Sequence, residues 1–257
     1  MKILKYKKLK DNRYELELDN GNNIVLIDDV ILKYNLLLKK SIDSKLLDEI
    51  LKANNECSCY SKAIKYLGIK QRHKNEMIKY LEKDGYNSDV VFKIIKRLEE
   101  QHYLNEEEYI KSFINDQLLL TNCGPAKIKH KLLNIGANED IILKYLNNIS
   151  KKIWLDKLNK IIDKKIIAYK KESINKTKEK ILLNCINECF KKEDIIDILE
   201  AKEIKSDLNK LDKEANKLYN KLKNKYQGSE LIYQIKGRLL NKGYLFHEVE
   251  EALKKIE

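Results

Sequence analysis

Apolar residues recur at helical spacing in a short template that appears four times along the chain. The first copy, residues 77–98, reads as an amphipathic helix that ends at Gly85, a tight turn, and a second amphipathic helix. Further copies begin at Ile128, Ile181 and Ile235, so the four starts are separated by 51, 53 and 54 residues. A regular period of this length predicts a helical repeat protein.

Each copy is preceded by a longer helical pattern, so each unit is predicted to hold three helices. No unit can bury its apolar face alone, and neighbouring units are therefore expected to stack. We predict a mainly all-α fold of tandem three-helix repeats, stacked into an elongated curved array. The leading helices are expected at 61–67, after Asn105, at 154–171 and at 212–226.

The first 35 residues follow a different pattern. Residues 13–18 alternate apolar and polar, and residues 23–27 form a second strand after a turn at Gly21, which predicts a β-hairpin. An isolated hairpin is marginally stable in water, so it should pack on the first helices or on a third strand near residues 3–6. Helices are expected at 30–38 and from Asp43 to about residue 52.

The repeat period and the N-terminal pattern together predict the domain organisation. The predicted parts are a β-hairpin with helices at 1–60, repeat 1 at 61–105, repeat 2 at 106–150, a divergent repeat 3 at 151–202 and repeat 4 at 203–257.

Composition agrees with long helices and short turns. Charged residues make up 36% of the 257 residues, and there are only 8 glycines and 1 proline, which argues against a β-sandwich or a glycine-rich nucleotide fold. No signal peptide or apolar run long enough to span a bilayer is visible, and five scattered cysteines do not form a disulfide framework. We expect a cytoplasmic monomer without a membrane partner.

Candidate catalytic and metal-binding residues do not form a site in the sequence. Cys185 and Cys189 are four residues apart, but they occupy core positions of the repeat template, where a free cysteine packs as a small hydrophobe. The four histidines form no metal-binding spacing, and no phosphate-binding loop or nucleophile motif occurs. The sequence predicts a non-enzymatic protein with no metal and no cofactor.

Basic residues recur at matching places in the repeats. The net charge is +12, and it is spread along the chain. Clusters beside the short helices would form a basic track on one face of the stack, where arginine can bind phosphate or carboxylate in a bidentate way. The alternative is that they are solvated faces of helices in a lysine-rich chain. The candidates for partner or DNA binding are Lys70, Arg72, Lys74, Arg97, Lys127, Lys129, Lys131, Lys236, Arg238 and Lys242.

The order and spacing of several motifs resemble the RecX family, in its longer Gram-positive form. The resemblance is strongest over residues 61–149 and departs from the family pattern at His73, His102 and Cys189. The residues that carry it are Tyr66-Leu67, Arg72-His73, Glu76-Met77, Leu81, Gly85-Tyr86, Gln101 through Asn105, Tyr109, Gly124-Pro125, Ile128, Leu132 and Gly136.

This resemblance implies a regulator of the RecA recombinase. RecX proteins are thought to lie in the groove of the RecA filament on single-stranded DNA and to limit its assembly, ATPase, strand exchange and coprotease activity. The implied partners are therefore the RecA filament and single-stranded DNA, with duplex DNA as a further candidate. The implied roles are homologous recombination, DNA repair and the SOS response.

Two other functions remain open from the residues alone. A stand-alone DNA-binding protein would read phosphates through the basic track, with an affinity that falls steeply with salt and does not depend on RecA. A helical-repeat scaffold for another cytosolic partner would need neither RecA nor DNA. Tighter binding to the coated filament than to bare DNA would separate the RecA regulator from the stand-alone DNA binder.

Overall fold

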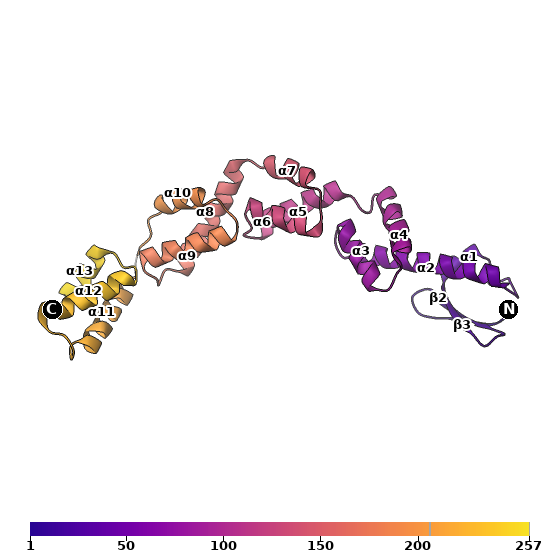
Figure 1. The fold of residues 1–257 in the computed structure, drawn as a ribbon, viewed down its shortest axis with the longest axis horizontal. Helices are drawn as coiled ribbons and strands as arrows, with labels where there is room; N and C mark the ends of the chain where they lie inside the picture. The colour runs from indigo at the N-terminus through magenta and orange to yellow at the C-terminus, as the bar shows by residue number, and fades with distance from the viewer. Residues whose placement is uncertain (206, 257) are drawn as a thin grey trace. The chain divides into compact units, whose positions relative to one another are not determined.

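A three-stranded antiparallel sheet begins the chain. The structure, a computed structural model, describes residues 1–205 and 207–256, so the predicted repeat at 203–257 includes two residues outside the described part (Figure 1). Strands β1 (Ile3–Lys8), β2 (Arg13–Leu18) and β3 (Asn23–Ile27) pair in the order β1-β2-β3. The predicted hairpin is confirmed, and it gains the third strand at the predicted place.

The helix that follows the sheet region is longer than the sequence predicted. Two separate helices were expected near 43–52 and 61–67, but α2 (Ser44–Leu67) is one helix of 24 residues. Asn54 lies in the middle of α2 and faces β3, where its side chain accepts from the Ile27 amide at 2.8 Å and donates to the Val25 carbonyl at 3.1 Å. Asn54 therefore ties α2 to the sheet.

The helix expected at 30–38 also differs. Helix α1 (Asp28–Lys33) ends early, because Asn35 adopts a left-handed backbone with φ of 50° and a turn follows. Leu16 and Leu26 of the sheet, Val30 and Ile31 of α1 and Ile50 of α2 form one buried cluster. The sheet thus packs on the first helices, as an isolated hairpin requires.

The rest of the chain is helical, with short connections. The helices are α3 (Lys74–Lys83), α4 (Ser88–Glu100), α5 (Glu106–Leu120), α6 (Pro125–Ile135), α7 (Glu139–Asn147), α8 (Lys151–Ala168), α9 (Ile174–Asn187), α10 (Lys192–Glu200), α11 (Leu208–Leu222), α12 (Gly228–Asn241) and α13 (Phe246–Lys254). The mainly helical fold class is confirmed.

Separate hydrophobic clusters form within successive groups of three helices. Met77 of α3 packs with α2 and α4, Ile181 of α9 packs with α8 and α10, and Ile235 of α12 packs with α11 and α13. Each of these three residues is fully buried. The chain divides into two compact units, residues 1–111 with 135–137 and residues 112–134 with 138–257.

Helices α3, α6, α9 and α12, which are the middle helices of the predicted repeats, are each followed by a residue with a left-handed backbone. Gly85, Gly136 and Gly243 have φ of 92°, 85° and 84°. In the third copy, where the sequence has no glycine, Cys189 adopts the same conformation with φ of 60°. The turn geometry is therefore kept in the divergent repeat, at the conformational cost that a side chain adds there.

A recurring contact joins the start of one middle helix to the end of the next middle helix along the chain. In every case a group at the helix N-terminus donates a hydrogen bond to a main-chain oxygen in the C-terminal turn of the later helix, inside one compact unit. The contacts are Asn75 Nδ2 to Ile135 O at 2.9 Å, Gly124 N to Glu188 O at 2.6 Å, and Ser173 Oγ to Lys242 O at 2.6 Å.

Candidate nucleic-acid interface

Arg72 is the predicted arginine most closely held by the fold. It precedes α3, and its guanidinium lies 3.9 Å from the centre of the Tyr66 ring, which stacks on Tyr80 with ring centres 3.9 Å apart. Lys62 lies 5.9 Å from the centre of the Tyr80 ring and pairs with Asp84. Such cation–π contacts fix the plane of the guanidinium. Tyr66 is half-buried and packs against the hydrophobic cluster of α2, α3 and α4.

The neighbouring His73 is buried and caps α3. Its Nδ1 accepts from the amide of Asn75, while Glu76 accepts from the amide of His73, which forms a capping box. Its Nε2 lies 3.3 Å from Glu106 Oε1, and Tyr109 donates to Glu76 at 3.1 Å. Burial and the nearby Glu76 carboxylate raise the pKa of Tyr109. This histidine orders the joint between α3 and α5, a role that the sequence did not reveal.

The remaining candidate cations of the first repeat are Lys70, Lys74 and Arg97. Arg97 of α4 lies 4.0 Å from the centre of the Tyr60 ring, whose hydroxyl donates to Gln101 at 2.8 Å. Lys70 is exposed and Lys74 is half-buried, and neither forms an ion pair within the described residues.

The three candidate lysines of α6 all have partners inside the protein. Lys127 pairs with Glu188 at 3.0 Å, and this hydrogen bond raises the pKa of Lys127. Lys129 pairs with Glu139 at 2.6 Å. Lys131 donates to Gln117 at 2.8 Å and lies 3.2 Å from the sulfur of Cys123.

Of the candidates on and just after α12, two lysines form ion pairs and one arginine does not. Lys236 pairs with Glu250 at 2.8 Å and lies over the Phe246 ring, and Lys242, just after the helix, pairs with Glu214 at 2.7 Å. Arg238 is exposed and has no ion-pair partner in the described part of the chain. Among the described residues, three of the ten predicted cations have no internal partner, namely Lys70, Lys74 and Arg238.

A row of lysines that the sequence did not single out lies on α8. Lys157, Lys160 and Lys164 recur at helical spacing on one face. Lys160 and Lys164 are exposed and form no ion pair among the described residues, while Lys157 donates only to the main-chain oxygen of Gln117, at 2.7 Å. The spacing was visible in the sequence, but it did not stand out among the many lysines.

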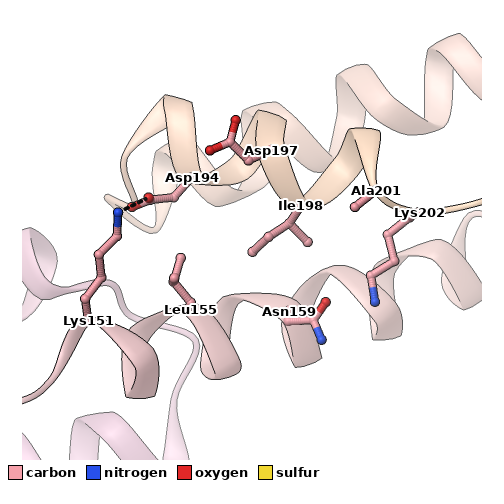
Figure 2. Close-up of a pocket in the computed structure, with 8 residues that line it drawn as sticks. All are labelled: Lys151, Leu155, Asn159, Asp194, Asp197, Ile198, Ala201 and Lys202. Atoms are coloured by element: carbon pink, nitrogen blue, oxygen red, sulfur yellow. Dashed lines mark ion pairs between the residues drawn. The ribbon is translucent and has the colours of Figure 1, made fainter.

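A hollow of about 410 Å³ lies between α8 and α10 (Figure 2). Leu155 and Ile198 lie between the two helices, and Lys151 at one end pairs with Asp194 at 3.2 Å. Lys202 at the other end pairs with Asp163 at 2.7 Å. Both lysines are therefore neutralised, and the hollow offers neither of them to a ligand.

The cysteines and histidines form no metal-binding group within residues 1–205 and 207–256. Cys59 and Cys185 are fully buried, and burial raises the pKa of each thiol to about 11. A protonated, enclosed thiol is a poor nucleophile and a poor metal ligand. In the same described residues, no helix is long and apolar enough to cross a membrane.

Comparison with known proteins gives full-length relatives. A regulatory protein RecX of Streptococcus agalactiae (serotype III, strain NEM316) is 30% identical over 259 aligned residues, covering 99% of this chain and 99% of the relative. A regulatory protein RecX of Staphylococcus aureus (strain JH9) is 28% identical and covers 98% of this chain and 94% of its own length. No protein-family model matches the chain.

Solved structures share the fold. A crystal structure of a regulatory protein RecX has a TM-score of 0.59 at 20% identity and covers 78% of this chain and 99% of its own. A crystal structure of RecX from Lactobacillus salivarius has a TM-score of 0.52 at 22% identity and covers 58% of this chain and 97% of its own. At these identities the likeness concerns the fold.

Proposed function

Because the chain belongs to the RecX family of regulatory proteins, we propose that it is a non-enzymatic regulator that binds the RecA filament on single-stranded DNA and inhibits it. Binding would limit filament assembly, ATP hydrolysis, strand exchange and coprotease activity. Through RecA the protein would act in homologous recombination, DNA repair and the SOS response, as a cytoplasmic monomer.

The observation that carries this proposal is the extent of the match. At 30% identity the relative from Streptococcus agalactiae is covered over 99% of its length, and so is this chain. The similarity therefore includes the N-terminal sheet and the helices up to the C-terminus, rather than a shared pair of repeats. A fold alone does not fix function, whereas similarity over a whole regulatory protein supports a shared partner.

The surface chemistry supports an interaction protein. Lys70, Lys74 and Arg238 have no ion-pair partner among the described residues, and the guanidinium groups of Arg72 and Arg97 lie 3.9 and 4.0 Å from the centres of tyrosine rings. Cations of this kind suit phosphate or carboxylate groups on a nucleoprotein filament. Most of the recurring lysines are held in internal ion pairs, which weakens the alternative in which a continuous basic track binds bare DNA.

Binding to RecA-coated and to bare DNA tests the proposal. A fluorescent single-stranded oligonucleotide is titrated with the protein, with and without RecA and a non-hydrolysable ATP analogue, at several salt concentrations. The proposal expects tighter binding to the coated oligonucleotide. Equal or weaker binding to it, with an affinity for bare DNA that falls steeply with salt, would instead identify a stand-alone DNA-binding protein.

Charge reversal sharpens the same measurement. Lys70→Glu, Lys74→Glu and Arg238→Glu together remove the unpartnered cations and are expected to weaken filament binding. A matched control, Lys39→Glu, Lys52→Glu and Lys217→Glu, changes three exposed lysines and gives the same net charge. The proposed role of the three cations predicts a larger loss in the first variant than in the control; an equal loss would reduce it to an effect of net charge.

A further inference from the structure

A groove of about 350 Å³ lies between the C-terminal end of α5 and one face of α8. Leu118 and Leu119 of α5 form one side of it, and Ile153 of α8 stands at its edge. All of these residues belong to the second compact unit. None of the ten cations predicted from the sequence lines the groove, so it is a separate surface.

The groove is positively charged. Lys157, Lys160 and Lys164 line it, and Asp156 is the only carboxylate among its described lining residues. About two turns of α8 separate Lys157 from Lys164, so the three lysines lie along about 10 Å of helix, at 1.5 Å per residue. Lys160 and Lys164 have no ion-pair partner in the described chain, in contrast to the lysines of α6.

Lys157 differs from the other two, because its ammonium group donates to the main-chain oxygen of Gln117 at 2.7 Å and lies 5.9 Å from the centre of the Trp154 ring. It is half-buried, and its burial, together with the nearby Lys131, lowers its pKa. The Gln117 acceptor is a neutral carbonyl in the last turn of α5, so Lys157 acts as a helix cap, whereas Lys160 and Lys164 have no such role among the described residues. A carboxylate or phosphate entering the groove would stabilise this charge.

The same surface carries exposed aliphatic side chains. Leu119 and the adjacent Leu120 are each 79% exposed, and Ile153 is 46% exposed. Aliphatic groups gathered beside unpaired charge are typical of a surface that is covered by a partner. Aliphatic side chains offer no ring on which a base can stack, and no aromatic side chain is among the described lining residues, which favours a protein partner over single-stranded DNA.

We propose that this groove is a docking surface for an acidic, aliphatic segment of the partner protein. Its carboxylates would face Lys157, Lys160 and Lys164, and its apolar side chains would cover Leu119 and Ile153. This inference rests on the proposed function, because the partner is the RecA protein itself. It assigns to α5 and α8 a protein contact that is distinct from the candidate DNA contacts.

Charge reversal on the exposed face of α8 tests the groove. Inhibition of the RecA ATPase on single-stranded DNA is measured for the wild type, for Lys160→Glu with Lys164→Glu, and for a control, Lys152→Glu with Lys170→Glu. The control changes two exposed lysines that do not line the groove, one of them on the same helix. The groove variant is expected to need about tenfold more protein for half-inhibition, while the control stays near the wild type.

A photo-crosslinker at Leu119 identifies what enters the groove. Benzoylphenylalanine replaces this exposed side chain, and the crosslinked product is analysed by mass spectrometry. A crosslink to an acidic segment of RecA supports the docking surface, and a crosslink to DNA overturns it. Full inhibition by the groove variant also overturns it while leaving the regulator intact; absence of inhibition by the wild type overturns the proposed function as well.

Discussion

The hydroxyl of Ser173 donates a hydrogen bond of 2.6 Å to the main-chain oxygen of Lys242, and so links the start of α9 to the end of α12. Ser173 is 3% exposed, so this hydrogen bond lies in a closed joint. The amide of Asn175 donates to Gly243 at 3.4 Å in the same place. The repeats are thus held together by specific polar contacts at matching positions, in addition to their separate hydrophobic cores.

Substitution of Gly243 tests the packing of this joint. An added Cβ would lie 2.8 Å from Ser173 Oγ and 3.2 Å from the Lys176 nitrogen, at a backbone φ of 84°. Gly243→Ala is therefore expected to lose about 2 to 3 kcal/mol of stability, of which about 1 to 2 kcal/mol is left-handed strain. Urea unfolding followed by circular dichroism measures the loss.

Gly85→Ala is the matched control for that strain. Gly85 has a similar φ of 92°, but an added Cβ meets nothing within 4 Å. It is expected to lose only the left-handed strain, which the lower entropy of alanine in the unfolded chain partly offsets, for a net loss of about 0.5 to 1 kcal/mol. Equal losses for the two variants would show that the joint at Gly243 accommodates a side chain and contributes little.

Cys189 offers the reverse experiment. It adopts φ of 60° where the other copies have glycine, and its thiol has only a weak contact with Asn187 O at 3.9 Å. Cys189→Gly should relieve the strain and, after the larger backbone entropy of glycine in the unfolded chain, raise the stability by about 0.5 kcal/mol. Cys189→Ala keeps the strain and should bring no gain. A clear loss on Cys189→Gly would contradict this explanation.

The ion pair between Lys127 and Glu188 joins α6 to the end of α9, and exchanging the two charges tests its contribution. Lys127→Glu places two carboxylates together and is expected to cost about 1 kcal/mol, because the pair is partly exposed. Adding Glu188→Lys restores opposite charges and should recover most of that stability in a double-mutant cycle. If filament binding is lost in the single variant and returns in the double variant, Lys127 acts through the joint; if it does not return, Lys127 contacts the partner.

The buried thiols predict an alkaline loss of stability. Cys59 and Cys185 have a pKa of about 11 in the folded protein, against an ordinary value of 9.0. Their contribution is complete below pH 9 and is lost as the pH rises through 11, by about 2 kcal/mol for each thiol. Between pH 8 and 11, the free energy of unfolding should therefore fall more steeply with pH for the wild type than for the double variant Cys59→Ala with Cys185→Ala. An equal pH dependence of the free energy of unfolding in the two proteins would contradict the raised pKa of these thiols.

Much of the fold followed from local pattern. The hairpin was visible because strand alternation and a turn at Gly21 are encoded within fifteen residues, and the repeat because Gly85, Gly136 and Gly243 recur at the same place. The continuity of α2 was missed, because its polar Asn54 is satisfied by strand β3, about 27 residues earlier. A tertiary hydrogen bond of that kind cannot be read from helical periodicity.

The candidate interface was less predictable for a similar reason. Lys127 looks like a free cation in the sequence, yet it pairs with Glu188, 61 residues away. Lys160 and Lys164 look the same in the sequence and have no such partner in the described chain. Whether a lysine is available to a ligand depends on which carboxylates the packing brings near it, and that information is not local.

The most direct test of the regulatory role is the ATPase rate of RecA on single-stranded DNA, titrated with this protein well below one molecule per RecA monomer. Strong inhibition is expected at these ratios, because one molecule bound to the filament would affect many RecA subunits. An unchanged ATPase rate, with the protein folded and able to bind DNA, would contradict inhibition of RecA by this protein.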